Sequence, residues 1–529
     1  MSTNRNPNFK IPIQLTIVII FSLVISIILV SCTVGPQFIK PKIPINQNWI
    51  EADSTFKINQ TTPDNSWWTV FNDSILNRLI GLAYNQNLPL QITGLKIMEA
   101  RAQLAIASGR QYPQTQAALG SLTAVGLSEN ASDALGINRN FVVYQAGFDV
   151  SWEADFWGKF RNDVKAQAAS LLATTADYNN ALVSLAAEVA RTYVIIRTFE
   201  MLIELAKQNV QLQEEGKRIA ESKLRNGAGS QLDVTQATTL LESTRASIPQ
   251  LEINLIQSQN ALCTLLGQPV GTVKPLLKNS RGIPNPPQEI SIILPVTLLN
   301  RRPDIRNAEH IAAAQCARVG MAKSELYPKI SIPGTIRTQS SNGTGVKSDN
   351  LFDIGSLMYT IGPQIVWPFL NYGQISNNVR VQDARLQQSL VNYQNTALKA
   401  VQEVEDNLTG FQKAVEIVKY EQNATTNAVQ SVKLALVQYR EGAVDYQRVL
   451  DTQRSQLQQE NSLTQARSTI ITNLISLYKA LGGGWELRQG QPVISDTTRI
   501  QMQNRTNWGN LFSKPVTLEK NEAYTPEDR

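Results

Sequence analysis

Few residues in this sequence of 529 are of a type and spacing that could carry out catalysis. His310 is the only histidine, and it lies in the apolar run AEHIAAA on an expected helix. A single histidine leaves no His-based triad and no multi-histidine metal site. There is no phosphate-binding loop of the G-x-x-x-x-G-K-S/T type, and the many Ser, Asp and Glu residues form no catalytic spacing. We therefore expect a protein that is not an enzyme and uses no metal or cofactor, with an extracytoplasmic hydrolase as a remote alternative.

The cysteine with the clearest chemical role is Cys32. A polar stretch with Arg5 and Lys10 precedes an uncharged apolar segment, residues 11–30, which is followed by Ser31 and Cys32. This layout is typical of a bacterial lipoprotein signal peptide, in which a small residue admits the peptidase and the next Cys thiol takes a lipid. We expect residues 1–31 to be removed and Cys32 to be lipidated. The alternative is an uncleaved membrane anchor, because about 20 apolar residues can span a bilayer.

The other charged and sulfur-containing residues indicate no further chemistry. The formal net charge is only +6, and its Lys and Arg residues are scattered, which argues against nucleic-acid binding. Cys263 and Cys316 lie in apolar helical contexts and are expected to be buried thiols, although an oxidising compartment would permit a disulfide. The six Met residues are not clustered, so they give no support to a soft-metal pathway through thioethers.

An internal repeat organises most of the chain. A shift of 215 positions aligns the sequence with itself without a gap, from Ala102 on Ala317 to Gly267 on Gly482. The chain therefore divides into an N-terminal segment (32–80), a first copy (81–270), a Pro-rich linker (271–297), a second copy (298–485) and a polar tail (486–529) that we expect to be loosely ordered.

Each copy contains a segment in which apolar and polar residues alternate. In FVVYQAGFDVSW the apolar residues alternate with Gln145, Gly147, Asp149 and Ser151, and YTIGPQIVW repeats the pattern in the second copy. A preceding strand is expected in QTQAALGSLTAVGL and in KISIPGTIRT. This length and period are typical of transmembrane β-strands. Four strands cannot close a barrel, and an open edge in lipid would leave backbone groups unsatisfied, so we expect the chain to oligomerise.

Helical periodicity fills the rest of each copy. In the first copy we expect a helix over 81–110, a long helix from 159 to 224, and a third over 231–266. The long helix would measure about 95 Å, and the two shorter ones stacked end to end would match it. Such helices have no globular core and must pack against neighbours in coiled-coil fashion. A soluble helical bundle with an incidental hairpin is the alternative, but it does not explain the amphipathic strands.

Several stretches resemble the TolC family of outer-membrane efflux proteins, in particular its lipidated, NodT-type branch. The resemblance covers residues 32 to about 486 and rests on CTVGPQF, WWTVFNDSILNRLIGLAYNQN, DFWGKFRND, NRRPDIRNAE, ELYPKISI, NYGQI and LYKALGGGW. It implies an α+β membrane protein that forms a homotrimer, with a twelve-stranded transmembrane β-barrel continuous with a long periplasmic α-helical barrel. It also implies an outer-membrane location, with a lipid anchor on the periplasmic side.

The family resemblance further implies passive conduction of small toxic compounds. They would be supplied by an inner-membrane pump of the resistance-nodulation-division type, joined to this chain through a periplasmic adaptor protein. A duct for type I protein secretion is the alternative that shares this architecture. A structural envelope lipoprotein without a channel is a remote one.

Asp233, Tyr439 and Asp451 match family positions that close the periplasmic aperture. In a threefold channel each residue occurs three times around the axis, so a carboxylate ring would attract cations and repel its own members. Arg448 stands where other family members carry an acidic residue, which implies weaker cation selectivity. The alternative is an ordinary helix-surface ion pair, because Arg448 and Arg454 lie three residues on either side of Asp451.

The turns LRNG and YREG should lie at the end farthest from the outer membrane, because the strands lie at the other end. The resemblance makes Arg225, Gly227, Arg440 and Gly442 the expected adaptor contacts. Both glycines also suit the left-handed conformation that commonly ends a helix. The stretch RRPD at 301–304 is interpreted as a helix start.

Overall fold

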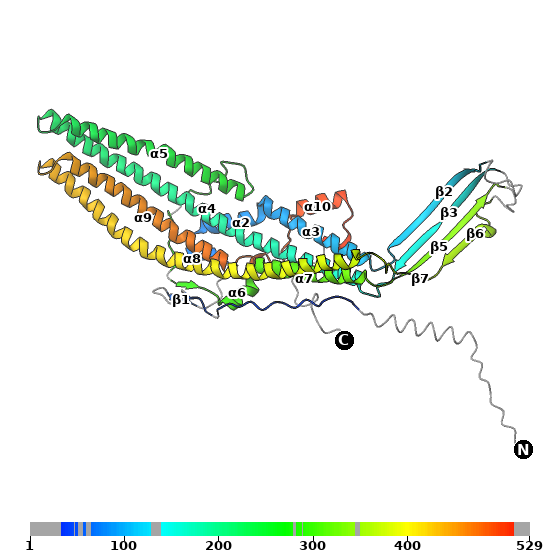
Figure 1. Cartoon of the computed structure of the whole chain (residues 1–529). Coiled ribbons are helices and arrows are strands. Elements are labelled where there is room, and N and C mark those ends of the chain that lie inside the picture. Colours follow the sequence, from blue (N-terminus) through cyan, green and yellow to red (C-terminus); the bar gives the residue numbers. More distant parts are fainter. Residues whose placement is uncertain are drawn as a thin grey trace, which may run out of the picture.

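The computed structural model describes residues 33–46, 48–50, 57–59, 65–128, 139–278, 282–287, 289–343 and 350–512. The chain is elongated, with helices along most of its length and a β-sheet at one end (Figure 1). The expected signal peptide and Cys32 lie outside the described residues.

Two long helical hairpins form the body of the molecule. In the first, α4 (Lys159–Arg225) has 67 residues and α5 (Gln231–Leu265) has 35. In the second, α8 (Gln374–Arg440) and α9 (Tyr446–Ala480) have the same 67 and 35 residues. Both hairpins turn at the end opposite the sheet (Figure 1). The shorter helices are α2 (Ser74–Gln86), α3 (Leu88–Gly109), α6 (Pro295–Arg301), α7 (Pro303–Ser324) and α10 (Asp496–Arg505), with 3-10 turns η2 (Trp67–Phe71), η3 (Ile354–Ser356), η4 (Glu486–Arg488) and η5 (Gly509–Phe512).

None of the helices among the described residues is both long enough and apolar enough to cross a membrane. The main core lies where η2 and α2 pack against the long helices. There Trp67 is almost fully buried and stacks on Tyr478 of α9, with ring centroids 5.4 Å apart. The WWTVF stretch therefore has a packing role. Cys263 and Cys316 are buried free thiols.

The sheet at the end of the molecule is antiparallel, in the order β2-β3-β5-β6, with β7 also paired to β5. A separate pair joins β1 and β4 in parallel. The strands are β1 (Lys57–Asn59), β2 (Thr115–Gly126), β3 (Asn140–Glu153), β4 (Glu289–Ser291), β5 (Lys329–Ser341), β6 (Leu357–Ile361) and β7 (Gln364–Val366).

The last strand of the sheet differs from the expected continuous one. The alternation over 359–367 predicts a single strand, whereas the structure has β6 and β7 separated by Gly362 and Pro363. Proline has no backbone N–H to donate to the ladder, so pairing with β5 is interrupted there. Both pieces pair with β5, and the sheet keeps four strand positions.

The expected helix over 81–110 is also divided, at Asn87. Its backbone is extended (ψ 122°), and Pro89 follows at the start of α3, where its missing N–H is tolerated. The Asn87 side chain accepts a hydrogen bond from the Leu90 N–H and donates one to the Leu265 carbonyl at the end of α5, at 2.8 Å each. The end of α5 therefore meets the start of α3, and a single side chain satisfies backbone groups of both helices.

The second copy has the same joint with different chemistry. Arg302 precedes α7 and donates to the carbonyl of Ala480, the last residue of α9, at 2.8 Å. The same guanidinium pairs with Asp304 and with Glu403 of α8, at 2.6 and 2.8 Å. Pro303 and Asp304 lie in the first turn of α7, which confirms that the RRPD stretch is a helix start.

The expectation of a loosely ordered tail is wrong for residues 486–512. This segment contains α10 and returns to cover α3 (Figure 1). Ile494 and Met502 are buried, and the Arg101 guanidinium of α3 donates to the Leu511 carbonyl at 2.8 Å. The local sequence is polar, but a few apolar side chains find burial sites on the preceding helices.

The N-terminal segment runs along α7, away from the sheet (Figure 1). The Val34 N–H donates to the Trp157 carbonyl at 3.2 Å, and Lys40 pairs with Glu309 at 2.6 Å. Gly35 (φ +135°) crosses α7 at Gly320, and a Cβ on Gly35 would lie only 2.6 Å from the Gly320 Cα. Two glycines at the crossing allow the two backbones to touch.

We predict that Gly35→Ala will detach the N-terminal segment from α7. The added Cβ meets backbone atoms, and the left-handed conformation strains any L side chain. Hydrogen exchange over residues 33–46 should become faster. The control is Gly81→Ala in α2, where a Cβ meets nothing within 4 Å and exchange of that segment should not change. Unchanged exchange in Gly35→Ala would contradict the assigned role of the crossing.

Candidate functional site

The helical tip is the site that the sequence singled out, and local chemistry explains how it forms. Gly227 (φ +71°) and Gly442 (φ +79°) end α4 and α8 in left-handed conformations, as expected for helix ends. In the first turn Ser230 caps α5, and its backbone N–H is reached by the Asp233 carboxylate in a capping box. In the second turn the Asp445 side chain accepts from the Arg448 N–H at 3.2 Å. Each turn is thus stabilised by hydrogen bonds between its own side chains and its own backbone N–H groups.

A hydrogen bond joins the two hairpins at this tip. The Tyr439 hydroxyl at the end of α8 donates to the Asp233 carboxylate at the start of α5, at 3.2 Å. The Lys223 ammonium lies 5.0 Å from the centroid of the Tyr439 ring, and the Tyr446 ring packs edge-on at 5.0 Å. Asp233 and Tyr439 are therefore brought together, and we call this contact, with Lys223 and Tyr446, the tip latch.

Burial keeps the tyrosines of the tip latch protonated. Burial and the nearby Asp233 carboxylate raise the pKa of Tyr439 well above its ordinary value. The same two causes raise the pKa of Tyr446 to about 12. Both groups are neutral in the folded state, so their contribution to stability is complete below the ordinary tyrosine pKa of about 10 and is lost as the pH rises above it. At neutral pH the Tyr439 hydroxyl is a reliable donor.

The other expected gate residues lie on the exposed face of α9. The Asp451 carboxylate accepts from the Gln447 amide at 2.9 Å and lies 4.0 Å from the Arg454 guanidinium. Both members of that ion pair are more than half exposed, so within one chain it is the weak helix-surface pair that the alternative interpretation predicts. The exposed Arg448 side chain has no ion pair among the residues that the structure describes. None of these three belongs to the tip latch.

The four expected adaptor-contact residues all lie at the tip. Arg225 is exposed as the last residue of α4, and Arg440 lies 3.7 Å from Glu215 of the neighbouring hairpin. Lys223 and Tyr446, which complete the tip latch, were not predicted from the sequence. A signal for Tyr446 is present in the spacing of Tyr446, Val449 and Leu450, which form one apolar face at the start of α9.

A buried polar layer separates the apolar cluster at the tip from the main core. Asn209 and Gln213 of α4 face Gln453, Gln456 and Glu460 of α9 in this layer. Asn209 donates to Glu460 at 2.6 Å, whereas neither amide atom of Gln213 or Gln453 has a partner among the described residues. Each unpaired buried amide costs about 1–3 kcal/mol. These unpaired amides weaken the packing between α4 and α9 at this level, between the two apolar clusters.

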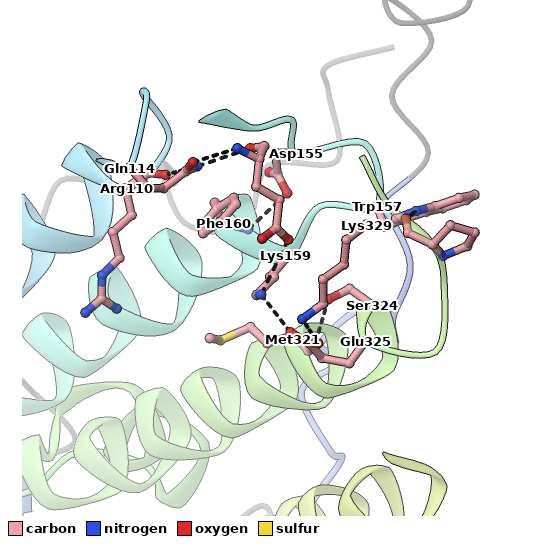
Figure 2. A network of polar contacts seen from close by, with 12 residues as sticks. Arg110, Gln114, Asp155, Trp157, Lys159, Phe160, Met321, Ser324, Glu325 and Lys329 are labelled. Atoms are coloured by element: carbon pink, nitrogen blue, oxygen red, sulfur yellow. Dashed lines mark hydrogen bonds and ion pairs between the residues drawn. The ribbon is translucent and has the colours of Figure 1, made fainter. Parts of the chain in front are cut away.

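Figure 2 shows the polar network at the opposite end, where strands pass into helices. Lys159 at the start of α4 pairs with Glu325, which follows α7, at 2.7 Å, and Glu325 pairs with Lys329 of β5 at 2.8 Å. Gln114, just before β2, exchanges hydrogen bonds of 2.7 and 3.1 Å with the backbone of Glu153 in β3. The network joins both copies of the repeat and fixes the sheet on the helices.

Electrostatics at this junction favour the ion pairs. Burial alone would raise the pKa of Glu325, but hydrogen bonds from Lys159 and Lys329 outweigh burial and lower the pKa. Gly158 (φ +77°) and Gly373 (φ +80°) precede α4 and α8 and permit the bend out of the sheet. Beside the first bend the Trp157 ring stacks on Tyr327, with centroids 4.5 Å apart.

No catalytic arrangement is found among the described residues. His310 is half-buried, and burial lowers its pKa to about 4, so it is neutral at physiological pH. No group of three or more His, Cys, Asp or Glu residues in the described part of the chain is arranged to hold a metal ion.

The sequence is similar to a known protein family and to several of its members. The sequence profile described as "Outer membrane efflux protein" matches residues 79–268 and 294–483. The chain is 28% identical over 463 residues to the cation efflux system protein CusC of Escherichia coli O6:H1 (strain CFT073), covering 87% of this chain and 98% of that one. It is 30% identical over 460 residues to the probable outer membrane lipoprotein SilC of Salmonella typhimurium, covering 87% and 97%.

A solved structure shows the same architecture. The outer-membrane channel OprN superposes with a TM-score of 0.79 at 28% sequence identity, and the match covers 86% of this chain and all of that one.

We predict that Tyr439→Phe will loosen the tip without unfolding the body. The ring and its packing remain, but the hydrogen bond to Asp233 is lost, which costs about 1 kcal/mol. Hydrogen exchange should accelerate over 223–233 and 439–446 and stay unchanged around Tyr478. Tyr420→Phe, at an exposed tyrosine of the same helix, is the matched control. If the tip exchanges at equal rates in Tyr439→Phe and wild type, the latch has no energetic role.

Proposed function

Because the chain belongs to the outer membrane efflux protein family, we propose that three copies assemble into one continuous duct through the outer membrane and across the periplasm. The protein is an outer-membrane channel of an efflux system. Our proposal comprises the trimer, its twelve-stranded barrel, the two-copy architecture and the partners described below. In it the chain conducts passively and catalyses no reaction.

One observation carries the proposal: the sheet has an apolar exposed face and two edges with no partner strand within the described chain. Leu122, Phe148, Ile336 and Tyr359 are roughly half to three-quarters exposed on one face. The edges are β2 on one side and β6 with β7 on the other. In lipid each unpaired backbone group costs several kcal/mol. Pairing β2 of one copy with β6 and β7 of the next removes every edge when the ring closes.

Barrel size sets the minimum number of copies, and the family architecture supplies the number three. One copy offers four strand positions, and bacterial outer-membrane barrels have eight or more strands, so at least two copies are needed. Three copies, as in the family architecture, give about twelve strands with head-to-tail contacts, which close as a threefold ring. The same ring brings together three sets of α4, α5, α8 and α9. Exposed apolar side chains such as Ile253 and Ile256 of α5, and Leu398 of α8, would then be covered by neighbouring copies.

The tip would meet a periplasmic adaptor, which links the duct to an inner-membrane pump of the resistance-nodulation-division type. The tip is farthest from the sheet and exposes Arg225 and Arg440 beside left-handed glycine turns. A charged rim of this kind suits a specific docking contact with low affinity per chain.

The tip latch would hold the periplasmic aperture closed. It joins the α4–α5 hairpin to the α8–α9 hairpin through Tyr439 and Asp233, and the polar layer beyond it lets the tips separate while the main core stays packed. Asp451, Arg448 and Arg454 would face the aperture in the trimer, where threefold symmetry places like charges together. With this assignment, both negatively and positively charged side chains would line the aperture.

The N-terminal segment would bring the lipid on Cys32 to the membrane interface. Thr33 lies against Gly158, where a Cβ would meet the Thr33 side chain at 2.7 Å, and this position is the junction of the sheet with α4. Thr33 is therefore at the level where the lipid-facing strands end. A lipid chain on the adjacent Cys32 would insert beside the barrel.

The cargo would be small toxic compounds rather than proteins. CusC is named for cation efflux, whereas in this chain the Met residues are few, six in all, and not clustered. A thioether pathway for soft metals has no support here, and we assign organic compounds.

We predict that the purified protein is a trimer with β-sheet signal in circular dichroism and forms channels in planar bilayers. Leu122→Arg, on the apolar face, should abolish membrane insertion. A wild-type monomer without β-sheet signal would overturn the proposed duct.

The double variant Arg225→Glu/Arg440→Glu should conduct like wild type but fail to restore drug resistance in a deletion strain, because only adaptor docking is lost.

We predict that Cys32→Ser will abolish incorporation of labelled palmitate while the full-length precursor still accumulates. Cys263→Ser, at a buried thiol, is the control and should incorporate label like wild type. Persistent labelling of Cys32→Ser, or no labelling of wild type, would contradict the lipid assignment.

A further inference from the structure

Charged residues are almost absent from the interior of the sheet. Among β2, β3, β5, β6 and β7 the charged residues are Asp149, Glu153, Lys329 and Arg337. Glu153 and Lys329 are terminal residues of their strands and belong to the junction network through ion pairs with Lys159 and Glu325. Asp149 and Arg337 are thus the two charges within the described strands, away from the junction.

These two charges form a bidentate pair between β3 and β5. The Arg337 Nε lies 3.1 Å from Asp149 Oδ1, and a terminal guanidinium nitrogen lies 2.5 Å from Oδ2. Two parallel hydrogen bonds fix the guanidinium in direction as well as in position. Both side chains are about a quarter exposed, so the pair remains in contact with solvent on one side.

The strand register puts the pair on the polar face of the sheet. Asp149 alternates with Phe148 and Val150, and Arg337 alternates with Ile336, whose exposed side chains belong to the apolar face. Gln145 and Gln339 lie opposite each other on the same face as the pair, with their amide groups 3.4 Å apart. In a closed barrel the apolar face meets lipid, and the polar face lines the lumen.

Gly147 makes room for the Arg337 side chain to lie along the strand. It is the direct partner of Arg337 in the register, and a Cβ there would lie 2.6 Å from the Arg337 Cγ. Without this gap the arginine could not turn toward Asp149, two residues along β3. The space at Gly147 and the two hydrogen bonds to Asp149 together hold the Arg337 guanidinium against the sheet.

We propose that the Arg337 and Asp149 pair sets the ion selectivity of the exit lumen, by keeping three arginines neutralised and held against the barrel wall. This inference rests on the proposed trimeric barrel. An unpaired charge that lines a narrow lumen attracts counter-ions and repels co-ions, whereas a bidentate pair presents no net charge. The pair therefore makes this section of the duct indifferent to the charge of its cargo.

A purely structural role is the competing explanation. The pair crosses from β3 in the first copy to β5 in the second, so it also stabilises their register. A structural role predicts that losing either partner weakens the sheet equally. A selectivity role predicts that the two losses shift the reversal potential in opposite directions. The sign of this shift therefore distinguishes the two explanations.

The test is the reversal potential of the reconstituted protein in a KCl gradient. Asp149→Asn leaves Arg337 unpaired and should shift the reversal potential toward the chloride equilibrium value. Arg337→Gln leaves Asp149 unpaired and should shift it toward the potassium value. Asp496→Asn removes one partner of the exposed pair with Arg499 on α10, outside the sheet, and should leave it unchanged. Shifts of opposite sign support the proposal, and equal or absent shifts overturn it.

A second measurement avoids any difficulty in assembling Asp149→Asn. In Arg337→Cys, a trimethylammonium methanethiosulfonate reagent restores a positive charge after the channel has formed, while Cys263 and Cys316 are buried. Labelling should move the selectivity back toward wild type. An unreactive thiol, or a reacted one with unchanged selectivity, overturns the lumen assignment. If the wild type is a monomer without β-sheet signal, the proposed duct fails first, and that result is distinct from conduction with unaltered selectivity.

Discussion

The need to pair every backbone N–H and C=O group in lipid is the constraint on which the rest of the structure depends. A sheet with β2 at one edge and β6 with β7 at the other cannot remain open in a bilayer. Within the described residues every strand of this sheet is already used, so the proposed duct takes the missing strands from other copies. In that assembly closure by other copies dictates where everything else lies. The helices would continue the ring at the junction, and their exposed apolar faces would meet equivalent faces of neighbouring chains.

Much of this arrangement could be predicted from the sequence, because repeating patterns encode it. Alternation predicted β3 and the segment that became β6 and β7, and the preceding strands were expected where β2 and β5 lie. The long helices end at the glycine turns that were expected. The matched positions Asp233 and Tyr439 do meet. The failures have two causes. The break at Asn87 and the partner Tyr446 have local signals that were not used, namely Pro89 after Asn87 and the apolar spacing of Tyr446, Val449 and Leu450. The ordered segment 486–512 and the partner Lys223 depend instead on contacts between residues far apart in the chain, which no local pattern records.

The two copies show how one geometric problem is solved with different side chains. Asn87 and Arg302 are equivalent positions, and both donate to the last carbonyl of a neighbouring helix. Asn87 acts as a small neutral cap, whereas Arg302 also binds Asp304 and Glu403. The second joint is therefore tied to α8 by charge and the first joint is not. The copies have the same outline, but their charges differ at the joints and at the junction network. Lys159 and Lys329 correspond to the uncharged Gln374 and Gln114, and Glu325 corresponds to Arg110, which has the opposite charge.

The N-terminal segment also has a consequence for the order in which the protein folds. Residues 33–50 contact groups synthesised much later, because Lys40 binds Glu309 and the Ile50 N–H binds Glu405, 355 positions further along the chain. Contacts of such long range form late, because the loop between them must first be ordered. This segment is synthesised early and is thus among the last to reach its final place. Its docking therefore requires that both halves of the chain have already folded.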